Sequence, residues 1–189
     1  MALNSIQLAS QALIKIGASP ISDFDEGSAE STVAATLYGS TRDALLSAHP
    51  WNFATAQRQL SRLEAVPVAD FECAYQLPAD FLRALSAGSS DRGRGIDFRI
   101  LSHRLHTNAP AVTLTYIFRP PENAFPPFFD EALIARLAAE YCLPITESTS
   151  RADALHQLAE ERFRTARLID AQQDTPPRID DYTLVGVRG

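Results

Sequence analysis

Histidine is the side chain best suited to binding metals or transferring protons near neutral pH, and the chain has four: His49, His103, His106 and His156. Only His103 and His106 are close in sequence. Two histidines at this spacing can share one face of a helix, whereas positions three apart in a strand point to opposite faces. The surrounding residues are typical of a strand, and no third ligand lies nearby in sequence. We therefore interpret the histidines as surface or strand-edge residues and expect no metal site.

Carboxylates gather in the loop before a predicted helix, where Asp23, Asp25 and Glu26 lie close together. Such a group could bind a cation or supply a general acid and a general base. Electrostatics explains the group more simply, because Glu26 and Glu30 lie near the positive end of the dipole of that helix. We interpret two further acidic pairs as solvated charges: Glu160-Glu161 and Asp180-Asp181.

The sequence has no motif of a catalytic or cofactor-binding loop: HExxH, GxSxG, GxxxxGK[ST] and GxGxxG are all absent. The turn Arg92-Gly93-Arg94-Gly95 is too short to hold a phosphate. We expect this turn and Arg99 to contact solvent, or else a neighbouring subunit or DNA, in that order of preference. Cys73 and Cys142 lack the spacing of a metal site or a redox pair, which predicts two buried, reduced thiols. We predict no catalytic residue and no cofactor.

The composition is that of a folded protein. The 189 residues are 46% hydrophobic and 21% charged, which excludes a disordered chain. A net charge of −6 disfavours a generic nucleic-acid binding surface, because neutralising phosphates needs an excess of Lys and Arg. The N-terminus lacks the basic start of a signal peptide, and no run approaches the roughly 18 apolar residues of a membrane span. We expect synthesis in a cytoplasm and no membrane partner.

Two amphipathic helices are predicted in the first part of the chain, from apolar residues that recur every three or four positions. The first covers residues 2–16 and ends at Gly17, which suits the left-handed conformation past a helix end. Ser28 caps the second, which ends at His49-Pro50 because proline lacks the N–H that continues a helix. Residues 51–56 hold the only tryptophan and are predicted to form a packed elbow.

Two more helices are predicted in the C-terminal half by the same periodicity. One covers residues 128–142 and is closed by Pro144. The other is long, starts at Ser148 or Ser150, and stops before Pro176-Pro177.

The region between the two pairs of helices has the composition of strands and turns. After Arg58 its apolar residues lie in short segments that Pro67, Pro78 and Gly88 interrupt. The clearest strand candidates, rich in β-branched and aromatic residues, are residues 97–101, 104–106 and 111–118. An antiparallel meander is the simplest topology for strands so close in sequence.

These segments predict an α+β fold that is mainly α: a four-helix bundle, a small antiparallel β domain inserted between its second and third helices, and an extended C-terminal arm. The predicted domains are a discontinuous helical domain (residues 1–56 and 127–173), a β-rich domain (57–126) and the arm (174–189). A strand-prone segment on a free end is typical of strand addition to a partner. The predicted partner-binding residues of the arm are Pro176, Pro177, Tyr182, Leu184, Val185 and Val187.

Several phrases of the sequence together resemble tail tubular protein A, the head-to-tail adaptor family of short-tailed bacteriophages. The first phrases are Ala12-Leu13, Ile16-Gly17-Ala18, Ile21, Phe24, Glu26-Gly27-Ser28, Arg42-Asp43 and Pro50-Trp51-Asn52-Phe53-Ala54. The later ones are Tyr75, Leu77-Pro78, Asp80, Arg83, Ala135-Arg136-Leu137-Ala138 and Pro144-Ile145-Thr146-Glu147-Ser148. The most specific are Pro-Trp-Asn-Phe-Ala and Leu-Pro-x-Asp. The resemblance covers nearly the whole chain and weakens after Asp174.

The resemblance implies a structural virion protein and not an enzyme. Such a protein would form a ring, twelvefold in that family, beneath the portal protein, and would join the capsid to the tail or nozzle protein. Genomic DNA would pass through the channel of the ring without sequence-specific binding. We therefore expect a homo-oligomer at the head–tail interface of a virion, synthesised in the cytoplasm of a host bacterium.

We interpret the motif residues as structural, and we expect the arm to make the partner contacts. The predicted roles are core packing for Trp51 and Phe53, a helix stop for Pro50, a turn or cap for Asp80, and backbone conformation for Gly17 and Gly27.

Two alternative functions stay open. A virion-associated peptidoglycan-cleaving enzyme needs a pair of acids in a cleft. A small DNA-binding regulator needs a basic helix, for which the last helix offers Arg162, Arg164 and Arg167.

Overall fold

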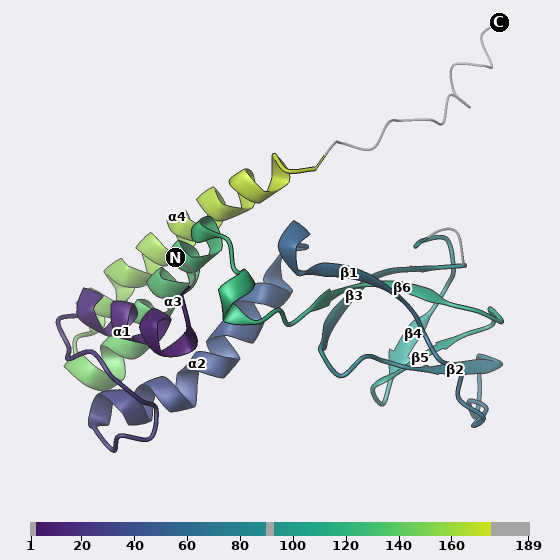
Figure 1. Cartoon of the computed structure of the whole chain (residues 1–189), viewed down its shortest axis with the longest axis horizontal. Coiled ribbons are helices and arrows are strands. Elements are labelled where there is room, and N and C mark those ends of the chain that lie inside the picture. Colours follow the sequence, from purple (N-terminus) through teal and green to yellow (C-terminus); the bar gives the residue numbers. More distant parts are fainter. Residues whose placement is uncertain (1–2, 90–92, 175–189) are drawn as a thin grey trace, which may run out of the picture.

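The computed structural model of the chain describes residues 3–89 and 93–174. These residues form four α-helices, two single-turn 3-10 helices (Asn52–Ala54 and Glu122–Ala124) and six β-strands. The helices gather at one end of an elongated molecule and the strands at the other (Figure 1). The fold is therefore α+β, as the sequence predicts.

The first helix, α1 (Ser5–Lys15), begins at a cap that the apolar periodicity does not reveal. The Asn4 side chain accepts a hydrogen bond from the Gln7 N–H at 2.8 Å, and the Gln7 side chain accepts one from the Asn4 N–H at 3.0 Å. Because of this capping box the helix begins at Ser5, whereas the predicted helix begins at residue 2. Past the helix end Gly17 has φ +78°, which is the left-handed conformation predicted for it.

The second helix, α2 (Ala29–Ala48), has both of its predicted ends. The Ser28 hydroxyl oxygen accepts a hydrogen bond from the Ser31 N–H at 3.0 Å, which satisfies a free donor of the first turn. Gly27, just before the cap, has φ +80°, a backbone conformation that glycine adopts without a clash at Cβ. The helix stops at His49, which is extended because Pro50 follows it.

The C-terminal helices are α3 (Pro127–Thr146) and α4 (Thr149–Ala171), and Ser148 precedes α4 as predicted. The prediction that Pro144 closes α3 is wrong, because the helix continues through this residue. A proline so close to a helix end removes one hydrogen bond and disturbs less than one further turn. The helix ends instead at Glu147, whose φ of 55° is left-handed.

Helix α3 is the centre of the helical part, since α1, α2 and α4 all pack against it. Its buried side chains are Phe129, Ala132, Leu133, Ile134, Ala135, Leu137, Ala138, Ala139, Tyr141 and Cys142. On the side of α4, Ala135 and Ala139 pack against Ala159. Side chains this small let two helix axes approach closely.

The six strands all lie between α2 and α3 in sequence: β1 (Thr55–Gln59), β2 (Cys73–Gln76), β3 (Phe81–Gly88), β4 (Arg99–Leu101), β5 (Arg104–Thr107) and β6 (Thr113–Phe118). They form two antiparallel sheets with the strand orders β1-β6-β3 and β2-β5-β4. The predicted meander is therefore wrong. Strand β6 is the most apolar and β-branched of the set, so it takes the central position, where both of its edges are paired.

The two sheets share a hydrophobic core that is separate from the helical core. Its fully enclosed members are Leu60, Cys73, Tyr75, Leu77, Ala87, Leu105, Val112, Leu114 and Tyr116. Cys73 lies in this core and Cys142 lies in the helical core, and both thiols are buried and unbonded, as predicted. Two strands were not expected: β1 begins within the predicted elbow, and no strand was predicted at β3.

The C-terminal arm lies almost entirely outside the described residues, which end at Asp174. The same holds for all of its predicted partner-binding residues: Pro176, Pro177, Tyr182, Leu184, Val185 and Val187. Among the residues that are described, no helix combines the length and the apolar character needed to span a membrane.

Candidate functional site

Three of the sequence phrases that carry the family resemblance meet where the β1-β6-β3 sheet joins the helices: Arg42-Asp43, residues 50–54 and residues 75–83 (Figure 1). Strand β1 directly follows the Pro-Trp-Asn-Phe-Ala phrase, and its first residue, Thr55, pairs with Ile117 of β6. Strand β3 begins within the sequence phrase from Tyr75 to Arg83, and its first residue, Phe81, pairs with Phe118 of β6. The two phrases therefore flank the same end of β6. We call this region the junction, and it comprises residues 38–55, 77–83 and 117–122 and Asp170 of α4.

Trp51 is the centre of the junction and is fully buried, as predicted. Its ring meets Phe129 of α3 and Phe163 of α4 edge-on, with centroids 5.1 and 5.7 Å away. Its indole N–H donates a hydrogen bond to the Leu45 carbonyl of α2 at 3.1 Å. Phe53, also predicted to be a core residue, is partly buried and packs against the same aromatic rings. One side chain thus binds three helices to the start of the β1-β6-β3 sheet.

Asn52 hydrogen-bonds the elbow, residues 51–56, to the last turn of α4. Its N–H donates to both carboxylate oxygens of Asp170 at 3.2 and 3.1 Å, and its side-chain amide donates to the Asp170 backbone carbonyl at 2.8 Å. The Asp170 side chain is almost fully buried, and this burial raises the pKa of its carboxyl group. The Asn52 N–H acts in the opposite direction, because it binds the charged form.

His49 and Asp170 form the arrangement in the junction that most resembles a catalytic pair. The His49 Nε2 lies 3.7 Å from an Asp170 oxygen. Desolvation lowers the pKa of His49, and the positive charge of Arg167 lowers it further. A His–Asp pair serves nucleophilic catalysis when a hydroxyl or a thiol lies beside the imidazole. The adjoining pocket of about 330 Å³ is lined by His49, Pro50, Asn52, Asp170, Ala171 and Asp174, none of which carries either group.

The second phrase turns the chain into β3. Leu77 is buried in the β core, and Pro78 beside it is buried as well. Asp80 lies in the turn, as predicted, and its backbone carbonyl accepts a hydrogen bond from the Arg119 N–H at 2.9 Å. Its carboxylate accepts another from the Tyr116 hydroxyl at 3.3 Å. Asp80 therefore ties the start of β3 to the end of β6.

Arg83, the last residue of that phrase, faces the elbow from β3. Its positive charge contributes to the lowered pKa of His49, after desolvation and Arg167. Its Nε is buried and has no hydrogen-bond partner in the described part of the chain. The neighbouring Leu82 and Leu85 pack against the helical core. Strand β3 thus contacts the helices directly.

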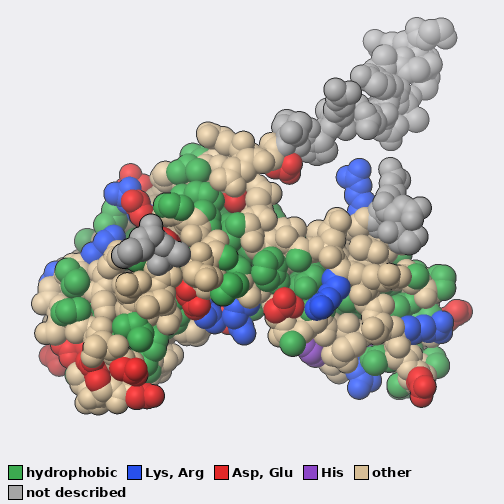
Figure 2. All heavy atoms as spheres, in the orientation of Figure 1, with side chains coloured by type: hydrophobic (Ala, Val, Ile, Leu, Met, Phe, Trp, Pro, Cys, Tyr) green, Lys and Arg blue, Asp and Glu red, His purple; other side chains and the backbone are tan. Residues whose placement is uncertain are grey.

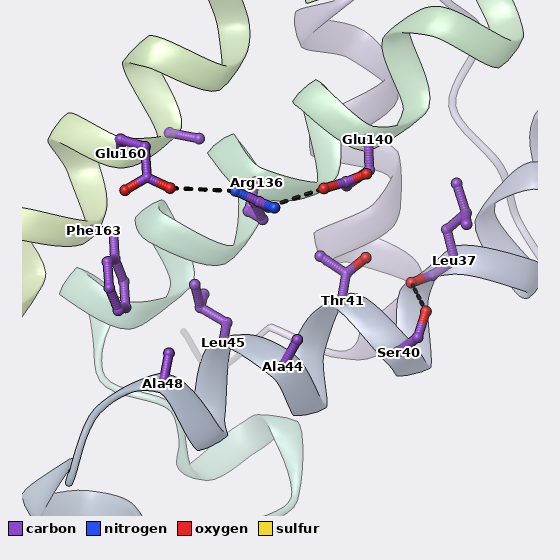
Figure 3. Close-up of a pocket in the computed structure, with 11 residues that line it drawn as sticks. Leu37, Ser40, Thr41, Ala44, Leu45, Ala48, Arg136, Glu140, Glu160 and Phe163 are labelled. Atoms are coloured by element: carbon purple, nitrogen blue, oxygen red, sulfur yellow. Dashed lines mark hydrogen bonds and ion pairs between the residues drawn. The ribbon is translucent and has the colours of Figure 1, made fainter.

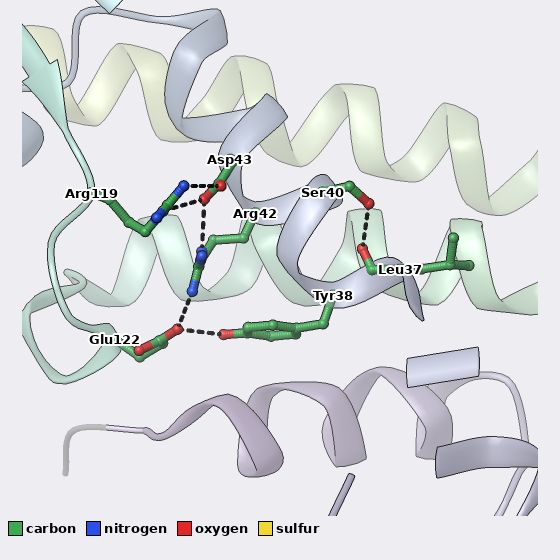
Figure 4. A network of polar contacts seen from close by, with 7 residues as sticks. All are labelled: Leu37, Tyr38, Ser40, Arg42, Asp43, Arg119 and Glu122. Atoms are coloured by element: carbon green, nitrogen blue, oxygen red, sulfur yellow. Dashed lines mark hydrogen bonds and ion pairs between the residues drawn. The ribbon is translucent and has the colours of Figure 1, made fainter. Parts of the chain in front are cut away.

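A chain of charged groups closes the junction on the side of α2 (Figure 4). Arg119 binds the Asp43 carboxylate through two hydrogen bonds, of 3.0 and 2.6 Å. Arg42 donates to Asp43 at 3.0 Å and to Glu122 at 2.6 Å, and the Tyr38 hydroxyl donates to Glu122 at 3.4 Å. Burial, followed by the charge of Glu122, raises the pKa of Tyr38, so its hydroxyl keeps its proton. These contacts fix α2 to the segment that leads from β6 into α3.

Replacing Arg42 by methionine is expected to lower the free energy of unfolding by about 2 kcal/mol. The reason is that Glu122 would keep a largely buried negative charge beside Tyr38 without its cation. Urea unfolding at low salt and at about 1 M NaCl measures the loss and its screening.

Arg136→Met is the matched control, because Arg136 also has two acidic partners but its side chain is more exposed, at 36% against 16% for Arg42. Its loss is expected to stay below about 1 kcal/mol. Equal losses for the two variants, or a loss at Arg42 that disappears at high salt, would show that Arg42 makes only a surface ion pair.

A groove of about 380 Å³ lies between α2 and α4, over α3 (Figure 3). It is lined by Leu37, Ser40, Thr41, Ala44, Leu45, Ala48, Arg136, Glu140, Ala159, Glu160 and Phe163. Arg136 crosses it, with its nitrogens 3.0 Å from Glu140 and 3.3 Å from Glu160. The groove is mainly apolar with one charged bridge, so it suits a protein side chain better than a phosphate or a metal ion.

The acidic loop before α2 is organised by its own hydrogen bonds. The Glu26 carboxylate accepts from the Ser22 N–H and hydroxyl, both at 2.9 Å, and from the Ser28 hydroxyl at 2.8 Å. These bonds lower the pKa of Glu26, and the bond from the Ser22 N–H has the largest effect. Glu26 therefore closes the loop, in addition to any effect on the helix dipole. No group of three potential metal ligands occurs among residues 3–89 and 93–174.

The histidine pair does not share a helix face. His103 lies in the turn between β4 and β5 with φ 58°, and His106 lies within β5. Strand β5 is the central strand of its sheet and His106 is half-buried, so the prediction of a surface or strand-edge residue is wrong for His106. Arg94 is exposed, and Arg99 lies 3.5 Å from Asp70, an exposed ion pair. Arg92 lies outside the described residues.

Asp130, in the first turn of α3, makes stability depend on pH. One of its carboxylate oxygens is buried without a hydrogen-bond partner in the described part of the chain, and burial raises its pKa from 3.8 to about 6. The folded protein therefore holds this proton more tightly than the unfolded chain. The resulting stability is complete below pH 3.8 and is lost as the pH rises through about 6.

The variant Asp130→Asn is expected to be more stable than the parent by about 1 kcal/mol at pH 7.5 and equally stable near pH 4. This figure allows for partial solvent screening and for the loss of a negative charge at a helix start. Urea unfolding at both pH values measures it, with the exposed Asp153→Asn as the control. A destabilised variant at pH 7.5 would mean that the Asp130 carboxylate has a favourable partner.

Three residues of the junction were missed by sequence reasoning: Asp170, Arg119 and Glu122. Asp170 is one of several acids on the last helix, and Arg119 and Glu122 flank the prolines at 120 and 121. Their partners lie 118, 76 and 80 positions away in sequence, so no local pattern reveals them. The nearest signal is Asn52, a polar residue between the aromatic side chains of Trp51 and Phe53.

No protein-family model matches the chain, and a search of curated proteins finds no match to it. The likeness to the adaptor family therefore rests on the sequence phrases and stays a prediction. What the geometry adds is the junction, where three of these phrases meet.

Proposed function

We propose that this chain is a structural head-to-tail adaptor of a tailed bacteriophage or a related particle. It forms a ring, twelvefold in the family that it resembles, beneath the portal protein and joins the capsid to the tail or nozzle protein. Genomic DNA passes through the channel of the ring without sequence-specific contacts. In this role the protein is part of the virion and is not an enzyme.

The meeting of three of the resembling phrases at the junction is the observation that supports this proposal. These three phrases are bonded to distant elements through Asn52 and Asp170, through Asp80 and Arg119, and through Asp43 and Arg119. Such bonds hold the helical and β parts of one subunit at a set angle. A subunit that links a capsid to a tail needs this rigidity, because its two parts face different partners.

The architecture that we propose for this role is a four-helix bundle around α3, with the β domain inserted between α2 and α3 and the arm bound to a partner in the assembled particle. Ring contacts are heterologous, so two different faces of each subunit must meet. The groove of Figure 3 and the exposed, Arg- and Glu-bearing surface of α4 are suitable faces. The net charge of −6 also suits a DNA channel, since an acidic wall lets a duplex slide.

Light scattering of the purified protein, with and without portal rings of its own particle, tests the proposal. We expect a monomer of 20.7 kDa that becomes a stoichiometric ring only on the portal. A monomer that ignores the portal would contradict the adaptor role. Peptidoglycan cleavage abolished by one carboxylate substitution would then favour the enzyme, and salt-sensitive binding to duplex DNA would favour the regulator.

A further inference from the structure

A second groove lies between the start of α3 and the last turns of α4, and it shares no residue with the groove of Figure 3. We call it the α3–α4 groove. It has a volume of about 400 Å³ and is lined by Pro127, Phe128, Glu131, Arg162, Thr165, Ala166 and Ile169.

The α3–α4 groove leaves apolar side chains partly in contact with water. Of the residues that line it, Ile169 is 39% exposed and Phe128 is only partly buried. Leu168, next to Ile169 in the chain but outside the lining, is 67% exposed. Hydrophobic side chains gather on the visible surface along α4 (Figure 2). Apolar surface concentrated at one place is a position where another segment gains free energy by covering it.

The chain itself has a segment of the right chemistry next to this groove. The described residues end at Asp174, just past the last turn of α4, and an apolar stretch follows at residues 182–187. Residues 175 to 182, fully extended, reach at most about 29 Å. The groove follows α4 from Ile169 back to Arg162, a rise of about 10 Å. The apolar stretch can therefore reach every part of the groove, with chain to spare for the change of direction that this requires.

The charges at the far end of the groove suit the same occupant. Glu131 and Arg162 face each other there at 3.6 Å, and both side chains are more than half exposed. An arm that runs back along α4 brings Asp180-Asp181, directly before the apolar stretch, to the end of the groove near Ile169, and Arg188, directly after the stretch, to the end at Glu131. Arg188 can then pair with the exposed carboxylate of Glu131.

We propose that, in the free subunit, residues 182–187 of the arm fold back into the α3–α4 groove of the same chain. The arm then shields the apolar side chains at the last turns of α4 from water. A partner of the arm must compete with this groove, so the apolar stretch stays unavailable until a surface that binds it better is present. The inference concerns the isolated subunit and goes beyond the adaptor role, on which it does not depend.

Disulfide trapping in the full-length protein tests the proposal. Thr165→Cys, in the groove, is combined in turn with Tyr182→Cys, Leu184→Cys, Val185→Cys and Val187→Cys. After mild oxidation of a dilute sample, intact mass and a non-reducing gel separate bonds within one chain from bonds between chains. We expect at least one pair to close within one chain about 10-fold faster than the control described next, because a docked segment has a high effective concentration.

The control places the cysteine at Glu160→Cys, in the groove of Figure 3, and pairs it with the same four arm positions. Equal rates in the two grooves would mean that the arm has no preferred site, and bonds only between chains would mean that a second copy fills the groove. Either result overturns the proposal. The parent protein, whose Cys73 and Cys142 are buried, gives the background.

Hydrogen exchange gives a second readout that needs no cysteine. The variant Leu184→Asp/Val185→Asp should speed the exchange of amides in the last two turns of α4 by about 10-fold, since the cover is lost. Amides of α1, on the far side of α3, should not change. Unchanged exchange at the end of α4 would show that the arm does not protect it.

Discussion

Removal of residues 175–189 is expected to leave a folded monomer that no longer joins heads to tails. The described core is complete without these residues, since both hydrophobic clusters and the junction lie before Asp174. Its free energy of unfolding should therefore stay within about 1 kcal/mol of the parent value. Under the proposed adaptor role, binding to portal rings should fall by at least about 100-fold, because the arm is proposed to supply several apolar anchors. Sedimentation with portal rings measures binding, and urea unfolding measures stability.

Two full-length variants separate the apolar stretch from the mere length of the arm. Leu184→Asp/Val185→Asp should lose portal binding as the truncation does, because it interrupts the apolar stretch. Asp180→Asn/Asp181→Asn keeps that stretch and should lose about 10-fold at most. Retained head joining by the truncated protein would refute the assignment of the arm as the partner-binding element.

Trp51→Ala is expected to be the most destabilising single change in the chain. Trp51 is fully buried among Phe129, Phe163 and neighbouring rings, and it also donates to the Leu45 carbonyl. Losses of about 3–5 kcal/mol are usual for such a truncation, a large part of the 5–15 kcal/mol that stabilises a typical domain. Circular dichroism in urea should follow the unfolding, because this variant has no tryptophan left for fluorescence.

Two controls show whether ring packing or the hydrogen bond matters more. Trp51→Phe keeps an aromatic ring but leaves the Leu45 carbonyl unpaired, and it should cost about 1–2 kcal/mol. Val68→Ala changes an apolar side chain that is fully exposed, so it should cost less than about 0.5 kcal/mol. A loss at Trp51→Ala no larger than that at Trp51→Phe would mean that the aromatic cluster adds little to stability.

The ends of the helices could be predicted from the sequence because they depend on neighbouring residues. Gly17 and Ser28 act through their own backbone or hydroxyl group on the adjacent turn, and the structure has both roles as predicted. The burial of Trp51 follows from its size and apolar character. Pro144 shows the limit of such reasoning, since a proline in the last turn of a helix disturbs too little to end it.

The strands were harder to predict because their pairing depends on residues far away in sequence. Strand β3, with the sequence Phe-Leu-Arg-Ala-Leu-Ser-Ala-Gly, is rich in residues that favour helices, and it is a strand because β6 pairs with it. The predicted elbow ends at residue 56 and so includes only Thr55 and Ala56 of β1, whose polar sequence forms a strand because β6 pairs with it. Apolar content indicated β6 as a strand, but its central position in the sheet required both partners.

The sequence by itself determined the α+β class, the roles of Gly17 and Ser28 at helix ends, the buried tryptophan and the phrases that resemble an adaptor. These features depend on contacts within a few residues or on the chemistry of one side chain. Only the tertiary structure decided where the phrases meet, that Asp170 receives Asn52 and that Arg119 binds Asp43. Those contacts join residues that are distant in the chain, so they exist only after the two cores have packed and brought α4 and β6 to the elbow.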